Sequence, residues 1–578
     1  MTSDPNKDLT RTMAAPGEPF VWITAMGLSI GLLMVIGLLG VIWANGLPVF
    51  WPNRVVEVTL NTGVSNPVPN AAETITGEIV QTRNKRIPIL DASGKKITDQ
   101  KEVQFYIGNK DAYGLNFVFV NRADIASMSE PPDIYRIERL EYGIAFAYPQ
   151  RILLENGSSI AATSPDFSNE FASLVDAASS RRHDIERIEK HDIGAINSRL
   201  NDLRIKGSGS DKSEITSLNE KYELLAAKAR ALRTEQAANL LVYKTPSGVE
   251  RQLPIGDIVA YCQPNKLDLF EQTSLFLHNI WNFLSEDPRE ANTEGGIFPA
   301  IFGTFVMTLL MSIAVVPFGV IAAIYLREYA KQGLFVRSVR IAVNNLAGVP
   351  SIVFGVFGIG FFVYFVGGTI DSLFFSDYLP TTTFGTGGIL WAAFTLALMT
   401  VPVVIVATEE AMAAVPRGMR EGSLSCGASK WQTIRHIVLP ASLPGILTGL
   451  ILAMARGAGE VAPLMLVGVV KLAPSLPLDT EFPFFHFERK FMHLGFHIYD
   501  LGFQSPDSEA AKPMVFATTL LLILLVVILN LAAILIREKL RKKFSAGAFY
   551  PNRHRLTLAT DSDSHRLQRT QAGLHQYP

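Results

Sequence analysis

The chain has 578 residues, of which 48% are hydrophobic and 18% are charged, and its formal net charge at pH 7 is −1. This composition fits a protein that combines membrane spans with a sizeable water-exposed part. The nearly neutral charge gives no electrostatic reason to expect binding to nucleic acid. The two cysteines, Cys262 and Cys426, fall on opposite sides of the membrane in the topology derived below, which excludes a disulfide framework.

The first apolar run extends from about Phe20 to Ile42. Roughly twenty such residues are needed to cross the hydrocarbon core of a bilayer. The run is too long for a typical signal peptide, and no convincing cleavage site follows it. Trp22, Trp43 and Trp51 suit the two membrane interfaces. We therefore expect residues 1–43 to form an N-terminal tail and an uncleaved first transmembrane helix.

Residues 44–296 have the composition of a soluble insertion between the first and second spans. Six segments with apolar alternation predict strands of a β-rich base: Arg54–Leu60, Val103–Ile107, Asn116–Val120, Tyr142–Tyr148, Leu241–Lys244 and Ile255–Cys262.

A charged stretch at about 166–241 interrupts this base and has helical periodicity. Its second half carries a heptad seam of six residues: Ile215, Leu218, Tyr222, Leu225, Ala229 and Leu232. Gly207–Asp211 breaks the stretch in the middle, so we expect an antiparallel helical hairpin. Two roles stay open for it: a spacer or scaffold, and a docking surface for a substrate-binding protein.

Five further apolar stretches predict a five-helix core over 297–543. They are about Pro299–Leu326, Ile341–Val366, Gly388–Ala407, Ser442–Val470 and Val515–Ile536. We expect a mainly α, polytopic membrane protein with six transmembrane helices and an α+β insertion that carries the hairpin.

Short loops indicate the orientation of the spans, because Lys and Arg concentrate on the cytoplasmic side. Three segments are rich in these residues: 327–340, 417–435 and 537–543. The connection 367–387 contains two aspartates and no Lys or Arg. The pattern predicts that both termini lie in the cytoplasm and that the insertion lies outside. Residues 544–578 are polar and irregular, and we expect a disordered cytoplasmic tail.

The polar loop 409–440, before the fifth span, has the pattern of a helix, a turn and a second helix. Gly427 can adopt the left-handed backbone conformation that ends the first helix. Ser429 can cap the second helix, which carries Lys430 and Trp431. Pro440 suits the first turn of the following membrane helix, where a missing N–H costs little.

This loop resembles the cytoplasmic coupling loop of ABC importer permeases, Glu-Ala-Ala, three residues, Gly, nine residues, Ile-x-Leu-Pro. Five positions keep that pattern here: Glu421, Gly427, Ile437, Leu439 and Pro440. Gly422 and Ser423 replace the two alanines. The resemblance implies that the loop docks into a groove on a separate ATPase subunit. The alternative is an ordinary interfacial loop with a glycine turn.

The fifth span carries two charged residues, Arg456 and Glu460. They lie beside a stripe of small residues, Gly445, Gly449, Ala453 and Gly457, within about 100° on the helical wheel. We therefore expect both charges to face the bundle interior. Two interpretations compete. The pair orients the span, or Arg456 presents its planar fork to a passing oxyanion while Glu460 holds it and limits its affinity.

The sequence Arg456-Gly-Ala-Gly-Glu460-Val-Ala-Pro463 resembles the Arg-x-x-Gly-Glu-x-Ala-Pro motif of PstA-type phosphate permeases. Three other segments match: Gly295–Ala300, Asn345–Ser351 and Pro402–Glu410. The resemblance covers about 295–543 and fits an enlarged subclass with a long outer insertion. It implies that Arg456 and Glu460 lie on the phosphate pathway. Val406 occupies the place where some compact relatives have a second arginine.

The same resemblance implies a set of partners for inward phosphate transport. They are a second, PstC-type permease, two copies of a PstB-type ATPase inside, and a phosphate-binding protein outside. Asn345, in the predicted third span, either lines the pathway or relieves a kink at Pro350.

Enzymatic motifs are missing from the sequence. It has no Gly-x4-Gly-Lys-[Ser/Thr] phosphate loop, and its histidines show no convincing zinc spacing, so we expect no ATP site, cofactor or metal. His493 and His497 lie in a Phe-rich segment that we expect to fold over the pore mouth. Two other functions stay open: a permease for sulfate, molybdate or another oxyanion, and a membrane-anchored envelope scaffold.

Overall fold

The computed structural model describes residues 19–64, 66–69, 74–84, 101–206, 212–289, 292–473, 475–479, 484–505 and 508–549. Within them, six helical stretches are long and apolar enough to cross a membrane. They are Trp22–Phe50, Phe298–Tyr329, Ser351–Phe374, Ile389–Ala413, Lys430–Gly459 and Ala511–Lys542. The predicted six spans and the mainly helical fold class are confirmed.

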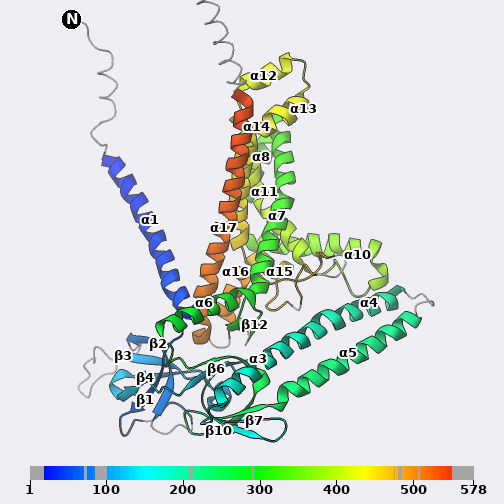
Figure 1. Cartoon of the computed structure of the whole chain (residues 1–578). Coiled ribbons are helices and arrows are strands. Elements are labelled where there is room, and N and C mark those ends of the chain that lie inside the picture. Colours follow the sequence, from blue (N-terminus) through cyan, green and yellow to red (C-terminus); the bar gives the residue numbers. More distant parts are fainter. Residues whose placement is uncertain are drawn as a thin grey trace, which may run out of the picture.

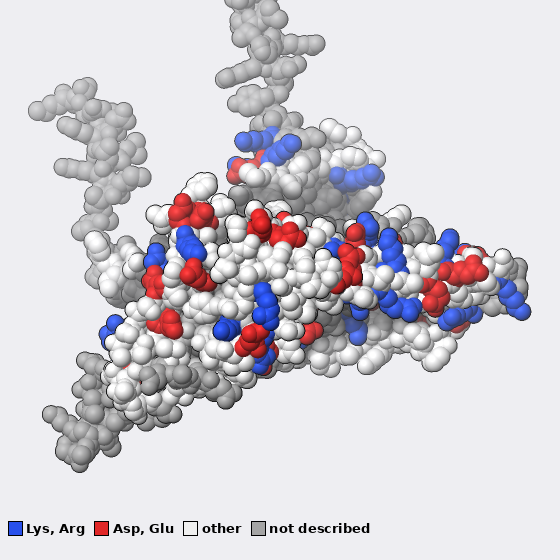
Figure 2. All heavy atoms as spheres, turned by 60° about the horizontal axis from the view of Figure 1, so that its bottom comes forward, with Lys and Arg blue, Asp and Glu red and all other residues white. Residues whose placement is uncertain are grey.

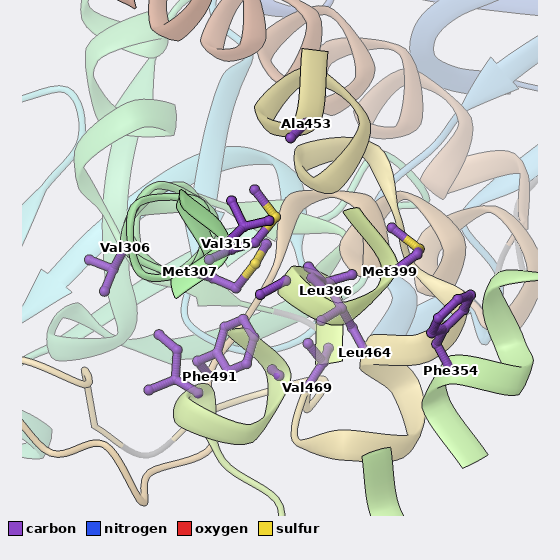
Figure 3. Packing of buried hydrophobic residues seen from close by; sticks show 14 of the residues in the cluster. Val306, Met307, Val315, Phe354, Leu396, Met399, Ala453, Leu464, Val469 and Phe491 are labelled. Carbon is purple, nitrogen blue, oxygen red and sulfur yellow. The ribbon is translucent and has the colours of Figure 1, made fainter. Parts of the chain in front are cut away.

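Three helices pack into the centre of the membrane bundle: α7 (Phe298–Ile324), α11 (Ile389–Ala413) and α14 (Leu439–Gly459). Their shared core includes Met307, Leu396 and Ala453, whose side chains point toward one another in Figure 3. By contrast, α1 (Pro19–Gly46) packs mainly on α17 (Ser508–Phe549) and stands apart from the bundle over most of its length (Figure 1).

The third span differs from the prediction of one helix from Ile341 to Val366. Here α8 (Leu334–Leu346) ends before Pro350, and a new helix begins at Ser351. That helix comprises α9 (Ser351–Phe357), the π-helix η8 (Gly358–Gly367) and α10 (Gly368–Phe374). The predicted continuity was wrong because a proline lacks the N–H of a helical hydrogen bond and disfavours helical geometry in the residue before it.

The fifth span is also broken. The sequence predicted one continuous helix as far as Val470. α14 ends at Gly459, Glu460 has extended backbone angles, and α15 (Ala462–Val467) follows. In an uninterrupted helix the ring of Pro463 would clash with the carbonyl of Gly459, four residues earlier. At its other end, helical structure runs from Lys430 into α14, so the second helix of the polar loop and the fifth span form one rod.

The described part of the insertion contains two large antiparallel sheets at one end of the bundle (Figure 1) and a two-stranded ribbon of β12 (Pro288–Arg289) and β13 (Glu294–Gly295). The first sheet has the order β4-β3-β2-β1-β5, from β1 (Val55–Leu60), β2 (Thr74–Asn84), β3 (Lys101–Tyr106), β4 (Phe117–Asn121) and β5 (Ile125–Ser129). The second has the order β10-β9-β7-β6-β11, with β8 (Ser159–Ala161) paired to β7. Its other strands are β6 (Tyr135–Arg139), β7 (Ile144–Leu153), β9 (Leu240–Lys244), β10 (Glu250–Pro254) and β11 (Ile258–Cys262). All six predicted strand segments contain a strand.

Two long helical arms project from the second sheet. One arm is α3 (Phe167–Glu186), the π-helix η3 (Arg187–Asp192) and α4 (Ile193–Lys206), and the other is α5 (Lys212–Ala238). All six predicted seam residues are partly or fully buried. Among the other residues of α5 as far as Leu232, only Ala226 is also partly buried. The helix α5 packs on α3 and α4. Gly207–Asp211, the predicted break, lies outside the described residues. Charges of both signs alternate along the projecting arms in Figure 2.

The segment from Phe484 to Gln504 covers the ends of α7 and α11 that lie nearest the insertion. The carbonyl of Arg489 accepts from the N–H of Ile389 at 3.0 Å, and the Leu494 N–H donates to Thr304 Oγ1 at 2.8 Å. Buried Asp371 organises the neighbouring connection by accepting the N–H groups of 383, 384 and 385 at 2.7–3.0 Å.

Two buried histidines make this cover sensitive to acid. Burial lowers the pKa of His493 to about 3 and that of His497 to about 4. The unfolded chain binds protons near pH 6.5 while the folded chain does not, so stability is full above pH 6.5 and falls on acidification. At pH 5 the expected loss is up to about 2 kcal/mol for each histidine.

We expect the thermal midpoint of the detergent-solubilised protein to fall between pH 7 and pH 5. His493→Asn should reduce this fall, because an asparagine can still accept the Gly495 N–H that caps α16 (Leu494–Tyr499) but cannot be protonated in this range. An unchanged fall in the variant would contradict the assignment.

The C-terminal tail begins later than predicted. α17 continues to Phe549 instead of ending near 543, because Arg537–Phe544 is made largely of strong helix formers. Residues 550–578 of the predicted tail lie outside the described residues.

Candidate functional site

The predicted coupling loop lies at the end of the bundle opposite the two sheets (Figure 1). Its first helix is α12 (Arg417–Ser425), and its second begins with α13 (Lys430–Thr433). Gly427 has a φ of 84°, the left-handed conformation predicted for the turn. Ser429 and Gln432 form a capping box, in which each side chain accepts the other residue's N–H. The helix–turn–helix prediction is confirmed, except that the second helix continues directly into the fifth span.

The π-helix η7 (Tyr325–Tyr329), which directly continues α7, holds both arms of this loop. The carboxylate of Glu328 pairs with Arg420 before the turn, and the carbonyl of Glu328 accepts from Lys430 after it. Arg420 also donates to the Met412 carbonyl at 2.6 Å. Glu328 was not predicted from the sequence, because it lies 92 residues from Arg420 and no local pattern links the two.

The predicted loop residues separate into an exposed set and a half-buried set. Glu421, Gly427, Lys430 and Trp431 are exposed, and Trp431 keeps 51% of its surface accessible. Ile437, Leu439 and Pro440 are half-buried, and Leu439 packs on a cluster that contains Met412 and Ile434. The exposed set can contact a partner, whereas the half-buried set fixes the loop to the bundle.

The second predicted site lies at the break between α14 and α15. Arg456 Nε is 3.5 Å from Glu460 Oε1, and their side chains are 33% and 22% exposed. Glu460 is the only ion-pair or hydrogen-bond partner of this guanidinium among the described residues. Both terminal nitrogens of Arg456 are therefore available to a bound anion.

The small-residue stripe brings neighbouring helices close to α14. A methyl group added at Gly445 or Gly449 would lie 2.4–2.5 Å from the Cβ of Ala411 or Ala407 on α11. At Gly457 it would lie 2.4 Å from the sulfur of Met311 on α7. The predicted role of the stripe in close helix packing is confirmed.

Gly449→Leu is expected to separate α14 from α11 and to lower the thermal midpoint of the solubilised protein strongly. Overpacking of this kind costs about 1–3 kcal/mol or more. Gly459→Leu is the matched control, because nothing lies within 4 Å of a Cβ at that position. Equal destabilisation by the two substitutions would contradict the packing role of the stripe.

Asn345 lies in the last turn of α8, outside the third span, and its carbonyl accepts the Gly348 N–H at 3.0 Å. It is therefore part of the break before Pro350. A polar line on α7, absent from the prediction, is formed by Thr304, Thr308 and Ser312. Each of these hydroxyls donates to the carbonyl four residues earlier at 2.7 Å, so their donors are satisfied within the helix.

Cofactor and metal ligands do not cluster in the part of the chain that the structure describes. No group of three or more His, Cys, Asp or Glu side chains is placed there to hold a metal ion. Cys262 and Cys426 are both free. Cys262 ends β11 in the second sheet, and Cys426 follows α12 in the coupling loop.

Residues 315–543 match the family described as binding-protein-dependent transport system inner membrane component. The phosphate transport system permease protein PstA 1 of Mycobacterium tuberculosis is 35% identical over 243 residues, which cover 42% of this chain and 71% of that protein. The corresponding protein of Yersinia pestis is 33% identical over 257 residues, 44% of this chain and 77% of that protein. The probable ABC transporter permease protein YqgH of Bacillus subtilis is 33% identical over 199 residues, 34% of this chain and 60% of that protein.

The family match includes the coupling loop, the Arg456–Glu460 site and most of the helical core. The chain therefore belongs to the family of binding-protein-dependent transport system inner membrane components, as a multi-pass permease of the PstA type.

Proposed function

We propose that this chain is the permease subunit of an ATP-driven importer that moves inorganic phosphate across the bacterial inner membrane. The observation that carries the proposal is the Arg456–Glu460 site, on a chain whose relatives are named phosphate transport permeases. A guanidinium with two free nitrogens matches the oxygens of phosphate, and the nearby carboxylate keeps its affinity low enough for release.

Membership of this family implies two kinds of partner, an ATPase and a substrate-binding protein. In the proposed complex the ATPase is PstB-type and present in two copies, and a PstC-type permease completes the pore. Glu421, Gly427, Lys430 and Trp431 contact the ATPase, because they are the exposed ones among the residues that carry the coupling-loop prediction. ATP is hydrolysed in that partner, and this chain has no ATP site of its own.

The proposed orientation places the coupling loop and both termini in the cytoplasm and the 44–296 insertion outside. Two observations support it. Lys and Arg concentrate in the loops at the α12 end of the bundle, and the sheets lie at the opposite end (Figure 1). The hairpin of the insertion is then a spacer or a surface for the binding protein.

Another oxyanion such as sulfate or molybdate is the second candidate substrate, because the chemistry of Arg456 suits any of them. An envelope scaffold explains the insertion but leaves the coupling loop and Arg456 without a role.

Uptake of labelled phosphate by cells with the chain deleted and then restored distinguishes these functions. We expect phosphate uptake to be lost on deletion and regained on restoration, with sulfate and molybdate uptake unchanged. Loss of sulfate or molybdate uptake alone would reassign the substrate, and no change in any uptake would favour a scaffold.

A further inference from the structure

The helix α6 (Leu269–Ser285), just before the second span, has an apolar face that the described residues leave exposed. A capping box of Asp268 and Glu271 fixes its start, with the Glu271 N–H donating to Asp268 Oδ1 at 2.7 Å. Four large apolar side chains are 60–82% exposed: Leu269, Phe270, Leu277 and Trp281. At 100° per residue they fall within a single arc of about 120°. Together they form an apolar stripe along the helix, here called the α6 stripe. One exposed polar residue, Thr273, lies within the same arc, and its hydroxyl is bonded to the Leu269 carbonyl at 2.7 Å.

A second exposed arc of α6 lies next to the stripe and is polar. It contains Glu271, Ser274, His278 and Ser285. The buried side of the helix contains Gln272 and Phe283, and Phe283 packs on Ile297 and Met492. The exposed surface is thus divided lengthwise into an apolar half and a polar half. This is the pattern of a helix that lies between hydrocarbon and water.

The depth of α6 follows from its bonds to two membrane spans. The Phe283 carbonyl accepts the Ile297 N–H at 2.9 Å, and the Glu286 carbonyl accepts the Phe298 N–H at 3.1 Å, where α7 begins. Asn279 donates to the Phe50 carbonyl at 3.0 Å, at the end of the first span. Figure 1 shows α6 lying across these span ends, between the bundle and the sheets. The helix is therefore held at the level where α1 and α7 cross the membrane surface.

We propose that the α6 stripe is inserted into the lipid bilayer at the surface nearest the insertion. Trp281 then joins Trp43 and Trp51 in an aromatic belt, and the ring of Trp51 already contacts Phe276 on α6 with centroids 5.5 Å apart. In this arrangement α6 holds the base of the 44–296 insertion against the membrane, independently of the substrate that the permease moves.

Spin labels at single cysteines can test this in the full chain reconstituted into phosphatidylcholine vesicles. The background is Cys262→Ser with Cys426→Ser, and the labels are placed by Leu277→Cys and Trp281→Cys on the stripe. Ser274→Cys and His278→Cys are the matched controls, because they are exposed on the polar arc of the same helix. Collision rates with oxygen, which concentrates in lipid, are compared with those of a water-soluble nickel chelate.

We expect the ratio of oxygen to nickel accessibility to be several-fold higher at 277 and 281 than at 274 and 278. Equal nickel accessibility at all four positions would place the stripe in water and overturn the proposal. Low accessibility to both reagents at 277 and 281 would show a protein partner there and would also overturn it.

A second measurement avoids labels altogether. Brominated phosphatidylcholine should quench the tryptophan fluorescence of the native chain more than that of Trp281→Phe. Identical quenching would contradict lipid contact at Trp281.

Discussion

Arg456→Ala is expected to reduce phosphate uptake by about 100-fold or more without dissociating the transporter. In the proposed function the substitution would remove two charge-assisted hydrogen bonds to the passing anion. Each would contribute about 1.5–3 kcal/mol, and 1.4 kcal/mol corresponds to a factor of ten. Among the described residues Glu460 is the only polar partner of Arg456, so the substitution breaks no other ion pair or hydrogen bond. The measurement is uptake of labelled phosphate into vesicles, together with co-purification of the ATPase.

Two further variants separate this role from a structural one. Arg456→Lys keeps the charge but loses the planar fork, and we expect it to restore only part of the uptake. Arg537→Ala is the control. Arg537 lies in the last span and donates to Thr448 Oγ1 at 3.2 Å, and its removal should leave uptake unchanged. Normal uptake by Arg456→Ala would show that the pair only orients the span.

Gly427→Val should uncouple the permease from the ATPase. With a φ of 84°, this position penalises a β-branched residue by roughly 1–3 kcal/mol, and the turn between α12 and α13 relaxes to avoid the strain. We expect transport to fall about tenfold or more, and stimulation of the ATPase by the loaded binding protein to disappear. Uptake and ATPase rates in reconstituted vesicles measure both effects.

Gly422→Val is the matched control in the same loop. Gly422 is also exposed, with nothing within 4 Å of an added Cβ, but it lies inside α12 with an ordinary helical backbone. Valine there is expected to leave transport close to normal, since Gly and Val differ little in helix propensity. Equal loss of coupling in both variants would show that added bulk, and not the left-handed turn, causes the defect.

The sequence predicted best those features that depend on neighbours along the chain. Apolar length predicted the six spans, and the spacing of three and four predicted the seam of α5. Alternation predicted six of the strands but missed β2, β5, β6, β8 and β10. The turn at Gly427 was predictable because a positive φ is a local requirement that glycine meets. The cap at Ser429 was predictable because it needs only a side-chain acceptor at the start of the helix.

Helix breaks were predicted poorly, although the residues that cause them were visible. Pro350 and Pro463 lie in strongly apolar runs, and hydropathy alone cannot distinguish a kinked helix from two separate ones. The stripe helix α6 was also overlooked within the insertion, despite the capping pair Asp268 and Glu271.

Contacts between distant segments could not be predicted at all. Glu328 reaches Arg420 across 92 residues, and Asp371 organises a turn twelve to fourteen residues later. Such partners depend on how helices pack, which no local pattern in one sequence specifies.

The unbroken rod from Lys430 to Gly459 has a mechanical consequence for transport. At 1.5 Å per residue, its 30 residues extend about 45 Å, with Trp431 near one end and Arg456 near the other. Such a rod behaves as a lever: a tilt of about 10° moves one end by about 8 Å relative to the other. A nucleotide-driven shift at Trp431 can thus displace the guanidinium by more than the diameter of a water molecule, without any signal passing through intervening side chains.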